Sequence, residues 1–167
     1  MLGRRVITDV ETVEQLARDG HELGSHSYGH LHAWKTDSTC AVDDIDAGYD
    51  SVSQWVKPDG IFRPPHGKVS FATWNALRRR GARICWWTHD SGDTWPIAPS
   101  PQKVVDDILT AGGGVVLMHD FDRGHAREEF VLNTTESLLN AAKKEEFALL
   151  TLSQLYSENR KRSDARK

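Results

Sequence analysis

The chain has 167 residues, 38% of them hydrophobic, and a formal net charge of -3. This length suits one domain with a real core rather than two, and the charge gives no electrostatic footprint for nucleic acid. No apolar run approaches the roughly 20 residues of a membrane span, and the first residues lack the apolar segment of a signal peptide.

Helices and strands are predicted to alternate along the chain. The helices are indicated by apolar residues at i, i+3 and i+4 between capping signals, and the strands by short apolar or β-branched runs between turn residues. Single strands alternating with helices imply the α/β class with a parallel sheet. In chain order we expect a helix over 9–19, a strand over 21–24, a helix over 40–56, a strand at Phe62, a helix over 70–80, a strand over 82–88, a helix opening at Pro101, a strand over 115–118, a helix over 132–145, a strand over 147–152 and a short helix over 153–159.

We expect one domain over residues 1–158, followed by a disordered tail over 159–167. The tail is polar throughout and has no apolar stripe. Cys40 and Cys85 fit neither a disulfide framework nor a zinc pattern, so we expect them to be packing residues.

Four polar segments follow apolar or β-prone runs. Because the carboxyl ends of parallel strands meet at one rim, their side chains are expected to build a site there. The segments are His26 to His30, Arg63 to Gly67, Asp90 to Asp93 with Trp95, and Leu117 to Asp120.

The first segment has the spacing of a metal-binding pair. His26 and His30 are four residues apart, so on a helical turn their Cβ atoms lie about 5 to 6 Å apart, a span that zinc can bridge. Two partly exposed loop histidines are an equally simple interpretation of this segment alone.

The other segments also leave two interpretations open. Arg63 precedes a proline-stiffened turn and has the geometry to hold a carboxylate bidentately. Asp90 and Asp93 fit a simple Asx turn, while Trp95 beside them favours a sugar pocket. His119 directly follows a buried strand, where a carboxylate such as Asp90 would fix its tautomer for general acid catalysis; the alternative is a hydrogen-bonded rim histidine.

Together and in this order, the segments resemble those of the NodB-type polysaccharide deacetylases, carbohydrate esterase family four. The family's H-[ST]-x-x-H segment matches His26 to His30, and its R-x-P-x-G turn matches Arg63 to Gly67. Its D-x-x-D-W segment matches Asp90 to Asp93 with the tryptophan one place late at Trp95, and its apolar-x-x-His segment ends at His119. The similarity runs from Met1 to about Tyr156.

The resemblance implies a deformed (β/α) barrel of NodB type and metal-dependent removal of N- or O-acetyl groups from a polysaccharide. It implies that His26 and His30 bind a divalent metal. Zinc is the first candidate for this metal, although cobalt and nickel also accept histidine ligands. It further implies that His119 protonates the leaving group, that Asp90 orients His119, and that Arg63 holds the catalytic base. The residues implied to bind substrate are Trp95, Leu117, Pro65 and Tyr28.

One family motif has no match. The T-F-D-D-G motif supplies the base and the third metal ligand, and the adjacent aspartates of this chain, at 43–44 and 106–107, fall inside predicted helices. Asp93, Asp120 and Asp122 are the candidates for a substitute ligand or base. We therefore expect a barrel truncated at its N-terminus by about one to two strands, with an open edge that a second chain would cover.

Two functions follow from these expectations. The first is a metal-dependent deacetylase of an acetylated polysaccharide. The second is a non-catalytic glycan-binding or regulatory remnant that uses aromatic residues such as Trp95 and Trp34 as a sugar platform. Family members often act outside the cell or in its envelope, so the compartment stays open.

Overall fold

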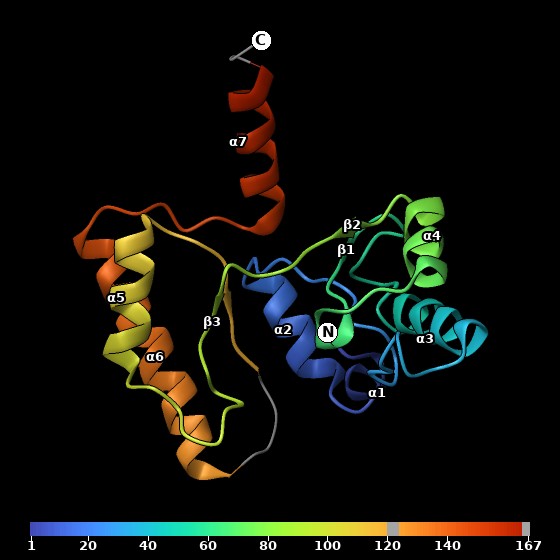
Figure 1. Ribbon diagram of the computed structural model, residues 1–167, viewed down its shortest axis with the longest axis horizontal. Helices are drawn as coiled ribbons and strands as arrows, with labels where there is room; N and C mark the ends of the chain where they lie inside the picture. The colour runs from blue at the N-terminus through green and yellow to red at the C-terminus, as the bar shows by residue number, and fades with distance from the viewer. Residues whose placement is uncertain (120–123, 165–167) are drawn as a thin grey trace. The chain divides into compact units, whose positions relative to one another are not determined.

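The computed structural model describes residues 1–119 and 124–164, which form two compact units (Figure 1). The first unit contains Met1–Trp86 together with the chain from Leu150 onward, and the second contains Trp87–Leu149. Each of the candidate segments therefore lies within one unit: the two N-terminal segments lie in the first unit, and Asp90, Trp95 and His119 lie in the second.

Two helices of the first unit begin at side-chain caps. Asp37 accepts hydrogen bonds from the backbone of Thr39 and Cys40, and Ser70 and Thr73 form a reciprocal capping box. Gly81 ends its helix in the left-handed region with a φ of 75°, which favours glycine. The helices are α1 (Gly3–Val6), α2 (Val10–Arg18), α3 (Ser38–Ser51), α4 (Phe71–Arg80) and α7 (Leu152–Asp164), with a short 3-10 helix at Pro65–Gly67.

A short parallel sheet and a helical core hold the first unit together. Strand β1 (Ile61–Phe62) pairs with β2 (Arg83–Ile84) in parallel, and Ser25 adds a single bridge to Phe62. Phe62 is fully buried, and the Tyr49 ring stacks near it while its hydroxyl donates to the Gly60 carbonyl at 3.0 Å. The buried core residues are Val6, Val13, Ile45, Tyr49, Val52, Val56, Phe62 and Leu77.

The second unit repeats the strand and helix pattern on a smaller scale. Strand β3 (His89–Asp90) pairs in parallel with β4 (Val116–Leu117), and helix α5 (Pro101–Ala111) packs against α6 (His125–Lys144). Ser100 caps α5 and Pro101 occupies its first turn, where the missing N–H has no helical partner to lose.

The predicted helices and the parallel α/β organisation are confirmed, but some bounds differ. The helix predicted over 40–56 ends at Ser51, the helix predicted over 132–145 begins at His125, and the strand predicted over 82–88 is limited to Arg83–Ile84. The strand predicted over 21–24 is wrong, because only Ser25 pairs with β1. The strand predicted over 147–152 is also wrong: no described strand lies beside it, and Leu149 is 69% exposed. The described strands form two separate two-stranded sheets, so closure into a barrel and its truncation stay predictions.

Helix α7 continues to Asp164, through much of the region for which the sequence predicted a disordered tail. Glu22 fixes its start by accepting hydrogen bonds from the backbone and hydroxyl of Ser153, and Lys161 pairs with Glu158 one turn away. Cys40 is exposed on α3 rather than packed, whereas Cys85 is partly buried.

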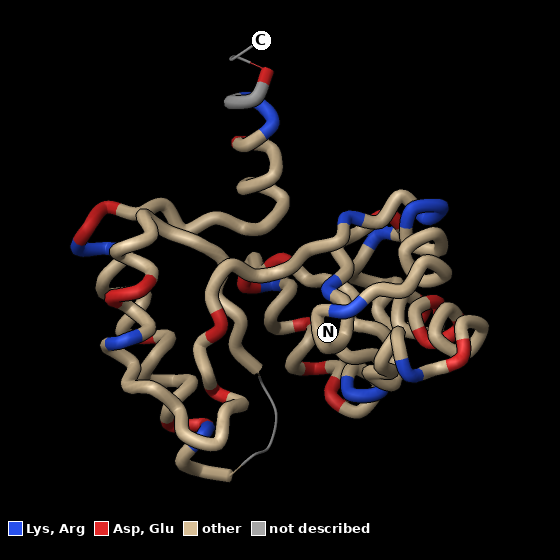
Figure 2. Tube along the Cα trace, viewed as in Figure 1, with Lys and Arg blue, Asp and Glu red and all other residues tan. Residues whose placement is uncertain are grey.

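Acidic and basic residues are interspersed over both units, as Figure 2 shows. A run of positive charge, Arg78, Arg79 and Arg80, lies in the last turn of α4, where it complements the helix dipole. None of the described helices is long and apolar enough to span a membrane.

Candidate functional site

The pairing of Ser25 with β1 positions His26. The Ser25 N–H donates to the Ile61 carbonyl at 2.9 Å, and the Arg63 N–H donates to the Ser25 carbonyl at 3.0 Å. His26 follows directly, with its Nδ1 2.5 Å from the Arg63 carbonyl oxygen. Because a carbonyl oxygen can only accept, Nδ1 carries the proton, and Nε2 keeps the lone pair that a metal binds.

Burial keeps the His26 ring neutral. The pKa of His26 is lowered to about 4, chiefly by desolvation and with smaller contributions from the charges of His30 and Arg63, while the bond to the Arg63 carbonyl opposes the shift. The neutral imidazole is the form that binds metal, so His26 offers its lone pair at neutral pH without losing a proton first.

His30 lies beside His26, with a distance of 4.8 Å between the ring centroids. Its backbone has a φ of 64°, in the left-handed region that non-glycine residues rarely adopt, and its N–H donates to the Ser27 hydroxyl at 3.1 Å. Asp44 of α3 holds the same loop by accepting from the Gly29 N–H at 2.6 Å. The loop is therefore fixed in a strained conformation, as is common where side chains are preorganised for function.

His66 and His32 extend this pair into a row of rings. The His66 ring centroid lies 4.5 Å from that of His30, and the His32 ring stacks on His66 at 4.8 Å. His66 also has a positive φ, 55°, within the turn that follows Arg63. No local spacing in the sequence signals the approach of His66 and His32 to His30, because it depends on how two loops fold together.

Arg63 has an unpartnered donor. Its Nε is buried and has no hydrogen-bond partner in the described structure, and desolvation lowers the pKa of its guanidinium. A buried cation of this kind is stabilised by an incoming carboxylate. The position supports the prediction that Arg63 holds an acidic group.

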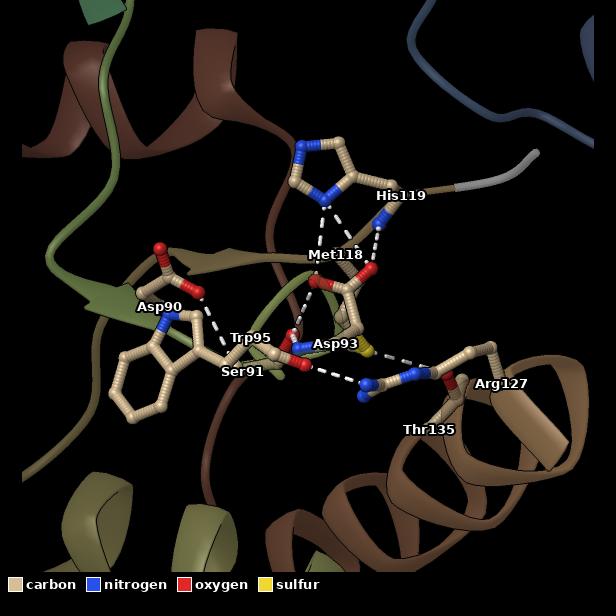
Figure 3. Close-up of polar contacts among 9 residues, drawn as sticks. Asp90, Ser91, Asp93, Trp95, Met118, His119, Arg127 and Thr135 are labelled. Carbon is tan, nitrogen blue, oxygen red and sulfur yellow. Dashed lines mark hydrogen bonds and ion pairs between the residues drawn. The ribbon is translucent and has the colours of Figure 1, made fainter. Parts of the chain in front are cut away.

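In the second unit, the partner of His119 is Asp93 (Figure 3). Asp93 is only 4% exposed, its two carboxylate oxygens each lie 3.1 Å from His119 Nδ1, and one of them accepts from the His119 N–H at 2.8 Å. The prediction that Asp90 orients His119 is thus corrected. The Asp90 carboxylate instead accepts from the Gly92 N–H at 2.8 Å, because Asp90 ends β3 and closes a tight turn.

The same pairing removes Asp93 from the candidates for a substitute metal ligand or base. Its carboxylate is engaged by His119 and by the Ser91 hydroxyl at 3.1 Å. The other two candidates, Asp120 and Asp122, lie outside the described residues.

The four residues predicted to bind substrate fall into two environments. In the second unit, Trp95 is 49% exposed, and Arg127 of α6 donates to its backbone carbonyl, while Leu117 is buried in β4. In the first unit, Pro65 is buried at the start of the turn that carries His66, and Tyr28 is 36% exposed. The rings of Trp95 and Tyr28 are therefore accessible to a ligand, whereas the side chains of Leu117 and Pro65 are buried.

Within the described residues, no group of three or more His, Cys, Asp or Glu side chains is arranged to hold a metal ion. His26 and His30 nevertheless have the chemistry of a ligand pair, because their rings are adjacent and His26 Nδ1 is held by a carbonyl, as in metal sites generally. His26 and His30 are therefore suited to supply two of the three protein ligands that a catalytic zinc site uses.

Comparison with known proteins points to one family. Residues 1–85 match the family described as polysaccharide deacetylase. The chain is 29% identical over 158 residues to a peptidoglycan-N-acetylglucosamine deacetylase of Bacillus cereus, covering 93% of this chain and 72% of that protein.

Two solved structures share the fold. The peptidoglycan deacetylase PdaC from Bacillus subtilis superposes with a TM-score of 0.81 and 21% identity, over 99% of this chain and 78% of that one. BA3943 from Bacillus anthracis, a CE4 family pseudoenzyme, superposes with a TM-score of 0.68 and 21% identity, over 86% of this chain and 48% of that one. The fold is therefore found in deacetylases and in a protein described as a pseudoenzyme.

Proposed function

Because the chain belongs to the polysaccharide deacetylase family, we propose that it removes N- or O-acetyl groups from an acetylated polysaccharide with the help of a divalent metal, for which zinc is the first candidate. The observation that carries the proposal is the His26–His30 pair, in which the ring of His26 is kept neutral and its Nδ1 is tied to the Arg63 carbonyl. The Bacillus cereus relative, a peptidoglycan-N-acetylglucosamine deacetylase, supports N-acetylglucosamine polymers as the substrate class.

His26 and His30 would supply imidazole nitrogens to the metal. When bound, a divalent metal polarises a carbonyl oxygen and lowers the pKa of its water. Arg63 would orient a carboxylate through its buried Nε, which has no other hydrogen-bond partner in the described structure. That carboxylate would take the proton of the attacking water.

In the second unit, His119 would donate a proton to the departing amine or alkoxide. Asp93 fixes Nδ1 as the protonated nitrogen between its carboxylate oxygens, so that Nε2 is the nitrogen that exchanges the proton. In the second unit, the exposed Trp95 ring and the buried Leu117 would contact the substrate. In the first unit, the exposed Tyr28 ring and the buried Pro65 would do so. A second chain covering an open sheet edge stays a prediction.

A non-catalytic function is the second candidate. It is supported by the similarity of the fold to BA3943, which is described as a CE4 family pseudoenzyme. Loss of a general base typically costs about 10² to 10⁴ in rate. In this case the chain would bind acetylated glycans without turnover.

Calorimetric titration of zinc into the chelator-treated chain tests the proposal, together with acetate release from an acetylated chitin pentasaccharide. We expect one saturable site that is lost in the His26→Ala, His30→Ala double variant, and acetate release that depends on zinc. His125→Ala is the control, because its side chain is 93% exposed and lies in the other unit.

Zinc binding that persists in the double variant would contradict the assignment of these ligands. Zinc binding without acetate release would favour the non-catalytic function.

A further inference from the structure

The row of rings in the first unit does not end at the histidines. The His32 ring lies 6.2 Å from the Trp34 ring, centroid to centroid, so the row runs from His26 through His30, His66 and His32 to Trp34. Trp34 is 64% exposed, although burial is the usual preference of an indole. We propose that this row is a glycan-binding track on which Trp34 stacks against a sugar ring of the polysaccharide substrate.

The Trp34 ring is held in place although it is exposed. Its Nε1–H donates to the Val69 carbonyl at 2.7 Å, which fixes the plane of the indole. A ring that is already fixed loses little conformational freedom when a ligand stacks on it. Because the only polar group of the indole is already satisfied, the ring offers an apolar face and no hydrogen bond.

A pyranose ring fits such a surface, because its C–H groups form an apolar face and its hydroxyl groups point outward. Lys68 lies over one face of the indole, with its ammonium 4.6 Å from the ring centroid, and provides a polar contact there. Ammonium protons donate to sugar hydroxyls. His32 Nδ1 already accepts from the Trp34 N–H at 3.2 Å, which leaves its Nε2–H as a donor. An aliphatic protein partner would leave these polar groups buried without partners.

The turn that carries His66 orders a second aromatic residue. Trp86 donates its Nε1–H to the Gly67 carbonyl at 3.1 Å and is 44% exposed. The carbonyls that fix Trp86 and Trp34 thus belong to Gly67 and Val69 of one short segment. The segment that follows Arg63 therefore holds both the ring next to the proposed ligands and the ring at the far end of the row.

This inference rests on the proposed function for its ligand class and extends that function to a chain longer than one sugar. Its test is equilibrium binding of the acetylated chitin pentasaccharide to the chelator-treated chain, measured by calorimetry. Without metal no turnover is expected, so the measured quantity is the dissociation constant. Acetate release and zinc binding report on the proposed function separately.

We expect Trp34→Ala to bind the pentasaccharide about tenfold more weakly, the loss corresponding to one aromatic stacking contact. Trp34→Phe keeps an aromatic ring, so its affinity for the pentasaccharide should be at least threefold higher than that of Trp34→Ala. Trp74→Ala is the matched control, because Trp74 is 42% exposed on α4 and no ring of the row contacts it in the described interactions. Its affinity should stay within twofold of wild type.

Equal weakening by Trp34→Ala and Trp74→Ala, or unchanged affinity in Trp34→Ala, would overturn the proposal. So would the absence of saturable binding by the wild-type chain. Sedimentation of the same variants identifies the competing occupant: if Trp34→Ala dissociates a dimer while glycan affinity is unchanged, the surface pairs two copies of the chain instead.

Discussion

The Asp93 carboxylate binds His119 at two places at once, the ring Nδ1 at 3.1 Å and the backbone N–H at 2.8 Å. The first contact selects the ring tautomer, and the second fixes the backbone at the end of β4. Asp90 makes neither contact among the described interactions and instead accepts from the Gly92 N–H. The two aspartates therefore have separable roles.

We expect Asp93→Asn to lower kcat for acetate release by about 10² to 10⁴-fold, since the amide can present an N–H to Nδ1 and favour the wrong tautomer. Asp90→Asn keeps an oxygen that accepts from Gly92 and should change kcat less than threefold. Long-range ¹H–¹⁵N NMR of His119 provides a second measurement: only Asp93→Asn should shift its tautomer balance. An equal effect of both substitutions would contradict the assignment.

The sequence could predict the order of elements and the residues near the site, but not all of their partners. Capping signals and periodicity are local, so α4 and α5 could be placed from Ser70, Gly81, Ser100 and Pro101. Which of Asp90 and Asp93 pairs with His119 depends on which carboxylate the turn after β3 directs toward that histidine. Both aspartates fit the same local sequence pattern.

Long-range packing explains the other differences. The approach of His66 to His30 joins two loops that are 36 residues apart in sequence, and neither loop has a periodic pattern. The apolar run at 147–152 has strand composition, but a strand also requires a neighbour with which to exchange hydrogen bonds. Among the described strands none lies beside it.

The pKa of His26 predicts how the stability of the metal-free chain depends on pH. Burial lowers this pKa from 6.5 to about 4, so the unfolded chain takes up the proton first as the pH falls. The contribution of neutral His26 is fully present above about pH 6.5 and is lost as the pH falls toward 4, by up to about 3 kcal/mol. Urea unfolding with chelator between pH 7 and pH 4 measures this loss.

His26→Asn should flatten that part of the stability profile, because asparagine does not titrate. His21→Asn is the control, since His21 is exposed and should leave the slope as in the wild-type chain. An unchanged slope in His26→Asn would assign the pH dependence to other groups.

Gly48 of α3 permits the close approach of the histidine loop. A Cβ at this position would lie 2.5 Å from the Ser27 carbonyl carbon and 2.8 Å from the Tyr28 nitrogen, both of them backbone atoms. In an open helix, Gly→Ala stabilises by about 0.5–1 kcal/mol, but overpacking costs about 1–3 kcal/mol. We therefore expect Gly48→Ala to lower the free energy of unfolding by about 1–2 kcal/mol and to weaken zinc binding.

Asp50→Ala on the same helix is the matched control, because Asp50 is exposed and its side chain faces no backbone of the loop in the described contacts. Urea unfolding and zinc calorimetry on both variants measure the two effects. A Gly48→Ala chain with increased stability and wild-type zinc affinity would show that the loop can move away without affecting the histidines.

Arg127 supports the loop that carries Trp95. Its Nη2 donates to the Trp95 carbonyl and also to the Pro96 carbonyl, the latter at 3.2 Å. Hydrogen bonds from a charged donor contribute about 1.5–3 kcal/mol, so Arg127→Ala should release the exposed Trp95 ring from its fixed position. If Trp95 contacts the sugar, KM for an acetylated oligosaccharide should rise about fivefold to tenfold while kcat changes less than threefold, because Arg127 itself makes no contact with the His119–Asp93 pair in the described interactions.

The Arg127 experiment has two controls with different purposes. Lys103→Ala removes an exposed cation of the same unit whose only described side-chain partner is Asp107, one helical turn away, so it should leave KM unchanged. Arg127→Lys keeps the charge and one donor and should restore part of the affinity. A fall in kcat with constant KM in Arg127→Ala would instead mean that the loop positions His119 rather than the substrate, because Asp93 lies on the same turn as Trp95.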